Sequence, residues 1–108
     1  MNNEKKFLVR PSNISSLAYD SYIKFVGDNI NLPNDKFIND FKSKFNLGIS
    51  RTSRVLHVEI LDRNINTLIL QTSTFNTITS NYLDHLMWVF IKTGEGKYEW
   101  TLNRYRLL

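Results

Sequence analysis

Two histidines are the side chains of this chain best suited to metal or acid–base chemistry, but their spacing does not predict a site. His57 and Glu59 lie two residues apart in an alternating segment, so both should point to the same face of a β-strand. His85 follows Asp84 in another segment, and no spacing rule places it beside His57. Two histidines and a carboxylate bind zinc only when they converge. We therefore expect His57 to be a half-buried or surface residue of a strand, and we assign no metal site.

The chain contains no cysteine, which excludes disulfides, thiolate zinc sites and thiol nucleophiles. The string His57-Val58-Glu59 also occurs in zinc deaminases, but their signature requires a Pro-Cys-x-x-Cys partner that this chain lacks. We find no Gly-x-Ser-x-Gly nucleophile motif and no Walker loop, and Gly94-Glu95-Gly96 is too short for a glycine-rich phosphate loop. We therefore predict a protein that is not an enzyme and has no cofactor.

One short string has the character of a DNA-binding motif. Leu47-Gly48-Ile49-Ser50-Arg51 resembles the turn of helix-turn-helix domains, in which a glycine precedes the second helix. The resemblance fails where it should hold, because Lys44 replaces the usual small residue and Arg54 replaces a buried aliphatic one. The sequence after Arg54 then alternates like a strand. We expect Gly48 simply to end a helix, and we assign the chain to no known family.

Basic residues near aromatic ones indicate nucleic-acid binding as an alternative function. The chain has 14 Lys and Arg against 10 Asp and Glu, and this net charge of +4 is compatible with a polyanionic partner without being diagnostic. Some sheet proteins stack bases on exposed aromatic rings while basic side chains contact phosphates. The candidate contacts for an accessory or regulatory protein of this kind are Lys42, Lys44, Arg51, Arg54, Arg104 and Arg106.

The spacing of apolar residues predicts two helices followed by strands. Helical spacing covers residues 13–26 and 34–46, and both segments are amphipathic, so each helix should lie on another layer. The expected caps are Ser12 or Ser15 for the first helix and Asn34 for the second, with Gly27 as a left-handed stop.

Alternating apolar and β-branched residues predict four strands, at about 54–61, 67–75, 86–93 and 97–106. Residues 4–9 could add a fifth strand at one edge. Residues 75–85 are either a connection with one helical turn or the continuation of a strand, and we interpret them mainly as a loop. The predicted fold class is α+β, within one domain that covers residues 1–108. In this fold, two N-terminal helices pack on one face of a four-stranded, or five-stranded, antiparallel meander sheet.

A hairpin at the end of the chain should determine which side chains are buried. Gly94-Glu95-Gly96 suits a three-residue loop in which Gly96 is left-handed. In that register Phe90 faces Trp100 and Trp88 faces Leu102, so one side of the hairpin is apolar on both strands. We expect this side to meet the helices and both tryptophans to lie in the core.

The opposite side of the same hairpin indicates the function that we favour. Residues 86–91 are continuously apolar, so this strand needs cover on both faces, whereas two helices can cover only one. The second face carries Met87, Val89 and Ile91, and an exposed apolar patch usually marks an interface. We therefore predict a small non-enzymatic protein–protein interaction domain, with another protein or a second copy of itself as its partner.

The remaining features bear on the setting of the protein. No apolar run approaches the ~18 residues of a membrane span, and no hydrophobic region follows the N-terminal lysines, so we predict no membrane association and a cytoplasmic location. The abundance of Asn, Ile and Lys suggests an AT-rich genome. Together with the small size, it fits an accessory protein of a phage or mobile element.

Overall fold

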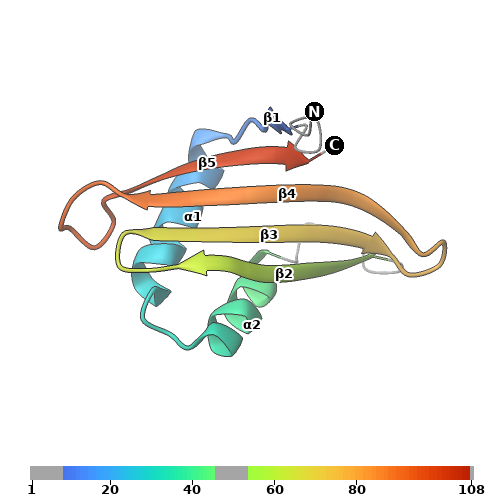
Figure 1. Cartoon of the computed structure of the whole chain (residues 1–108), viewed down its shortest axis with the longest axis horizontal. Helices are drawn as coiled ribbons and strands as arrows, with labels where there is room; N and C mark the ends of the chain where they lie inside the picture. The colour runs from blue at the N-terminus through green and yellow to red at the C-terminus, as the bar shows by residue number, and fades with distance from the viewer. Residues whose placement is uncertain (1–8, 46–53, 108) are drawn as a thin grey trace, which may run out of the picture.

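The helices precede the sheet along the chain, as the sequence predicts. A computed structural model describes residues 9–45 and 54–107. The strands form one antiparallel sheet in the order β1-β5-β4-β3-β2, and both helices lie on the same face of it (Figure 1). The predicted α+β class is therefore confirmed, with the five-stranded form of the predicted sheet. The elements in chain order are β1 (Val9–Pro11), α1 (Ser16–Asn29), α2 (Asn34–Phe45), β2 (Arg54–Arg63), β3 (Thr67–Asn76), β4 (Asn81–Lys92) and β5 (Trp100–Leu107).

The edge strand β1 extends to Pro11, two residues beyond the predicted range. It pairs with the end of β5, where Pro11 lies opposite Tyr105. The predicted range 4–9 overlaps it only at Val9, and residues 1–8 lie outside the described residues. Pro11 is tolerated because an edge strand has one side on which no N–H has to be donated.

Hydrogen bonds in the first turn set the position at which each helix begins. The α1 helix begins at Ser16 instead of residue 13, and the hydroxyl of the predicted cap Ser15 accepts a backbone N–H of the first turn at 3.2 Å. In α2, the predicted cap Asn34 is instead the first helical residue. The carbonyl of Pro33 accepts the first helical hydrogen bond there, at 2.9 Å.

The sequence predicts that Gly27 ends α1, but this prediction is wrong, because the helix continues through Gly27 to Asn29. Instead, Gly27 is the point where the loop of residues 93–99 meets the helix. A Cβ atom at this position would lie 2.5 Å from the carbonyl oxygen of Lys97 and 2.6 Å from the Tyr98 ring. Glycine therefore allows a close approach of two backbones here, without needing a left-handed conformation.

A carboxylate fastens the same loop to α1. Asp28 accepts a hydrogen bond from the Tyr98 hydroxyl at 2.7 Å and contacts the ammonium groups of Lys24 and Lys97 at 3.0 and 3.1 Å. These partners, the Tyr98 hydroxyl above all, hold the pKa of the Asp28 carboxyl well below its ordinary value of 3.8. The ionised form of Asp28 is thus the one that the junction stabilises.

Acid should therefore loosen this junction. A carboxyl whose pKa is lower in the folded state stabilises the fold above its unfolded pKa, and this contribution is lost as the pH falls toward the folded pKa. We expect the stability of the protein to decrease below about pH 4, and we expect Asp28→Asn to remove the junction's share of that decrease. Thermal melts across this pH range would measure it, with Asp20→Asn on the exposed side of α1 as the matched control. Parallel pH profiles for the wild type and Asp28→Asn would contradict the expectation.

Residues 75–85, predicted to be mainly a loop, belong mostly to strands. The β3 strand runs to Asn76 and β4 begins at Asn81, so that only residues 77–80 turn. The Asn76 side chain accepts two backbone N–H groups of the turn, at 2.9 and 3.0 Å. Ser80 completes the turn with a left-handed φ of 62°. A single asparagine therefore closes a tight connection that the sequence pattern did not indicate.

The β4–β5 hairpin has a longer loop and a different register from those predicted. Phe90 pairs with Leu102 instead of with Trp100, so the register differs by two residues. The loop spans residues 93–99 instead of 94–96. Because the shift is an even number of residues, every side chain remains on its predicted face of the sheet.

Glu99 explains the longer loop. Its carboxylate accepts the N–H of Gly96 at 2.9 Å, and its main-chain carbonyl accepts the N–H of Thr93 at 2.8 Å. These bonds close the loop without a left-handed residue, and no glycine that the structure describes has a positive φ. The predicted left-handed Gly96 is therefore wrong, and β5 starts at Trp100 instead of residue 97.

The core lies between the helices and the inner face of the sheet. Both tryptophans are buried there, each 5% exposed, as the sequence predicts. The Trp88 ring meets Tyr22 and Phe41 edge-on, at centroid distances of 4.8 and 5.6 Å, an arrangement that aromatic pairs favour. The largest side chains that are completely buried are Phe37, Phe41, Phe90, Leu68, Leu70 and Val26.

Arg63 connects the helical layer to the end of the sheet. A bulge carries β2 beyond its predicted end at residue 61 to Arg63. The guanidinium lies 5.8 Å from the centroid of the Phe37 ring and donates hydrogen bonds to the carbonyl oxygens of Ile30 and Leu32. These carbonyls belong to the α1–α2 connection, which is therefore held against β2.

Candidate functional site

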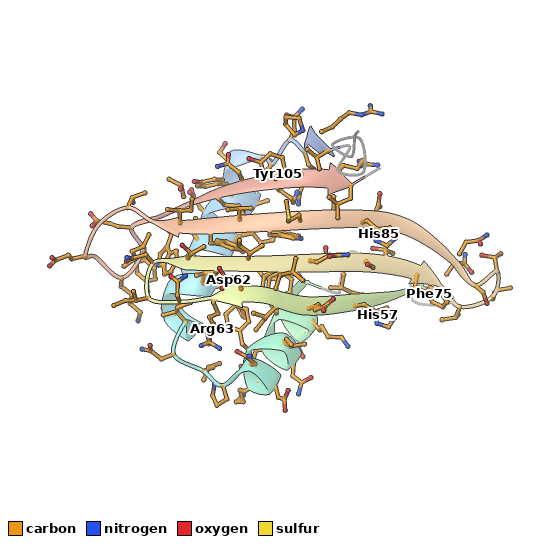
Figure 2. The ribbon with its side chains drawn as sticks, in the orientation of Figure 1. His57, Asp62, Arg63, Phe75, His85 and Tyr105 are labelled. Carbon is orange, nitrogen blue, oxygen red and sulfur yellow. The ribbon has the colours of Figure 1, made fainter. Side chains whose placement is uncertain are left out.

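Neither helix, nor any other described segment, covers the second face of the sheet. Figure 1 and Figure 2 look onto this face, with both helices behind the strands. On β4, Trp88 and Phe90 point toward the helices, whereas Met87, Val89 and Ile91 point the other way. Phe90 is 0% exposed and the adjacent Ile91 is 43% exposed, which shows the difference between the two faces. The three residues predicted as an interface therefore lie together on the uncovered face.

The three predicted residues are the centre of a wider apolar surface. Val89 pairs with Ile69 of β3, and Met87 pairs with Tyr105 of β5, which Figure 2 labels. Cross-strand neighbours on one face lie close enough for their side chains to touch. We call this contiguous surface the outer patch, and it consists of Ile69, Met87, Val89, Ile91 and Tyr105.

The centre of the uncovered face also lacks charged side chains. Of the described side chains that point outward from β3, β4 and β5, none is Asp, Glu, Lys or Arg. Glu59 and Asp62 lie on β2, at one edge of the face, and Figure 2 labels Asp62. Depletion of charge at the centre is typical of surfaces that become buried in an interface. Besides the outer patch, the outward residues are Thr67, Gln71, Ser73, Phe75, His85, Thr101, Asn103 and Leu107.

The structure brings together two histidines that the sequence gave no reason to associate. His57 and His85 pair with Ser73 from opposite sides, so the three residues form one row across β2, β3 and β4 (Figure 2). The Ser73 Oγ lies 3.2 Å from Nδ1 of His85, and the exposed His57 ring packs edge-on against Phe75. Because Ser73 is small, a groove of about 490 Å³ remains between the histidines and Glu59. Among the described residues, no group of three or more His, Cys, Asp or Glu side chains could hold a metal ion.

The basic residues predicted as nucleic-acid contacts divide between two elements. Lys42 and Lys44 lie in the last turn of α2, whereas Arg104 and Arg106 lie on β5. Arg54 is the first residue of β2. The predicted contact Arg51, the helix stop Gly48 and the predicted helix residue 46 lie outside the described residues.

The two arginines of β5 have partners within the protein. The Arg104 guanidinium lies 5.0 Å from the Trp88 ring centroid and donates to Ser12 Oγ and to the carbonyl of Asn13 at 3.1 and 2.9 Å. Arg106 is 53% exposed at its side chain and pairs with Asp84 at 3.2 Å. Arg104 is therefore a packing residue, and its charge is directed inward instead of toward a partner.

The fold defines a class, an α+β domain with helices on only one face of a five-stranded antiparallel sheet. No family model, curated protein or solved structure matches this chain. Neither of the described helices is long and apolar enough to cross a membrane. The function must therefore be inferred from the chain's own residues, foremost those of the uncovered face.

Proposed function

We propose that this protein is a non-enzymatic interaction domain that forms a twofold dimer through the uncovered face of its sheet. The main support is the outer patch, because the outward side chains that the structure describes on β3, β4 and β5 include no charged residue. A sheet that remained in water would be expected to alternate apolar with polar or charged residues. Here the outward positions of β4 from residue 87 to residue 91 are all apolar.

A second copy of the same face is the partner that fits these residues best. A twofold axis brings identical surfaces together, and a face without Asp, Glu, Lys or Arg at its centre does not repel its own copy. Two sheets that pack face to face lie about 10 Å apart and interdigitate their side chains. In the proposed dimer, the two outer patches form the core of a sandwich, and the helices lie on its outside.

Nucleic-acid binding receives less support from the described residues. Arg104 packs on Trp88, Arg106 pairs with Asp84, and both tryptophans are buried instead of available for stacking on bases. We also propose that the protein acts in the cytoplasm as an accessory protein of a phage or mobile element.

Dimerisation can be tested directly by sedimentation. We expect analytical ultracentrifugation to show a monomer–dimer equilibrium that shifts to the dimer at high micromolar concentration. The association should persist at high salt, because the outer patch that drives it is uncharged. A protein that remains monomeric throughout the concentration series would contradict the proposed dimer.

A further inference from the structure

A cavity of about 670 Å³ opens where α1 ends and the loops at one end of the sheet meet. In Figure 1 these loops converge at the left of the molecule. The walls come from the C-terminal part of α1, from the β2–β3 turn, and from Lys92, Lys97 and Trp100. Close packing of the 93–99 loop against Gly27 fixes one side of the opening. The cavity lies on the helix side of the sheet and is thus separate from the outer patch.

Positive charge is in excess at this cavity. Three cations, Arg63, Lys92 and Lys97, line it together with one carboxylate, Asp28, which already pairs with Lys97. Arg63 donates to main-chain carbonyls, and the Lys92 ammonium bonds a carbonyl and lies 5.3 Å from the Trp100 ring centroid. Neither Arg63 nor Lys92 has a carboxylate partner among the described residues. Two positive charges at the cavity are therefore not neutralised by an acid.

A second observation, independent of charge, indicates a missing hydrogen-bond acceptor. Trp100 is 95% buried, and its indole Nε1 has no hydrogen-bond partner among the described residues. Buried indole N–H groups normally have one, and Trp88 donates to Thr72 Oγ1 at 2.9 Å. Trp100 is a wall residue of the cavity, but its Nε1 is covered, so the wall has to open slightly before the acceptor oxygen of a ligand can satisfy this donor.

We infer that this cavity binds a phosphate group, held by the charges of Arg63 and Lys92 and by a hydrogen bond from the Trp100 indole. A phosphate has several acceptor oxygens, and its geometry suits a guanidinium. The cavity volume is in the range of small-molecule sites, about 300–1,000 Å³, so part of an organic group can enter with the phosphate. Ile65, which is 85% exposed at the rim, offers that group an apolar contact.

The two indole N–H resonances provide the test. Inorganic phosphate, added at constant ionic strength to the ¹⁵N-labelled full chain, should shift the Trp100 indole resonance along a saturable curve. The Trp88 resonance, whose donor is already paired with Thr72, should change little. Lys92→Gln should weaken binding about tenfold or more, as expected when a hydrogen-bonded charge is lost. The matched control is Lys36→Gln, which removes an exposed lysine of α2 that pairs with Asp40 and should leave binding unchanged.

Binding of two further ligands shows to which kind of molecule the phosphate group belongs. Tighter binding of a nucleoside monophosphate than of inorganic phosphate would support a small phosphate ester as the ligand. Tighter binding of a single-stranded oligonucleotide, with a steep salt dependence, would support a nucleic-acid backbone at the same site. The inference is overturned if phosphate leaves the Trp100 resonance unchanged, shifts both indoles equally, or binds Lys92→Gln as well as the wild type. Because the site does not depend on dimerisation, its failure and that of the proposed dimer are distinguishable.

Discussion

Replacing Trp100 with alanine should unfold much of the protein or lower its melting temperature severely. Trp100 is 5% exposed and packs in the core cluster that includes Phe90 and Leu102. Truncating a buried aromatic costs about 3–5 kcal/mol, because lost transfer energy and the cavity add. Small domains are stable by only about 5–15 kcal/mol, so this loss is a large share of the total. Thermal and urea unfolding, followed by circular dichroism, would measure it.

Thr101→Ala is the matched control for this substitution. Thr101 is the next residue of β5 and is exposed on the opposite face. Its truncation should change the free energy of unfolding by no more than about 0.5 kcal/mol. A Trp100→Ala variant as stable as the wild type, beside an unfolded Thr101→Ala variant, would mean that the two faces of the sheet are exchanged.

Val89→Asp should abolish dimerisation while leaving the monomer folded. Val89 lies between Met87 and Ile91 at the centre of the outer patch and pairs with Ile69. In the proposed dimer, the substitution buries an unpaired carboxylate from each subunit, which is strongly unfavourable. We expect the dissociation constant to rise at least about a hundredfold, or about 3 kcal/mol. Sedimentation velocity would measure the association, and circular dichroism would verify the fold.

Ile78→Asp provides a matched comparison for Val89→Asp. Ile78 is also a β-branched apolar residue, 78% exposed, but it lies in the turn between β3 and β4, away from the outer patch. This variant should dimerise like the wild type. A folded Val89→Asp variant that dimerises as well as Ile78→Asp would show that the interface lies elsewhere.

The sequence predicted the faces of the sheet more reliably than the strand pairs. Alternation of apolar residues decides on which side a residue lies, so an error of two residues in the hairpin left Trp100 and Val89 on their correct faces. The loop length was predicted wrongly because it depends on the hydrogen bond from Gly96 to the Glu99 side chain. The sequence around a charged loop residue such as Glu99 does not predict that its side chain will accept a hydrogen bond within the loop.

Sequence patterns could not predict sites whose residues come from several strands. His57 and His85 lie on either side of Ser73 only because β3 separates their strands in the sheet. That arrangement depends on the tight turn fixed by Asn76, whereas the sequence pattern predicts a longer loop there. Asparagine is abundant in this chain, so its turn-forming role could not be distinguished from a bias in composition.

The cavity at the end of the sheet is a second site that sequence patterns could not predict. Arg63, Lys92 and Trp100 come from three strands, and they meet only because Gly27 allows the 93–99 loop to pack on α1. None of the basic residues selected from the sequence is among them, because proximity along the chain was the only available criterion. By contrast, Met87, Val89 and Ile91 were predicted together, since alternation along a single strand is visible in the sequence.

The most direct measurement of the proposed dimer is a cysteine cross-link across its interface. The chain has no cysteine, so Val89→Cys introduces a single thiol at the centre of the outer patch. Asp20→Cys places one on the exposed side of α1 as a control. With a short bis-maleimide reagent at micromolar protein concentration, the proposed dimer predicts rapid, nearly complete covalent dimerisation of Val89→Cys and almost none of Asp20→Cys. Equally slow cross-linking of both variants, or faster cross-linking of Asp20→Cys, would contradict it.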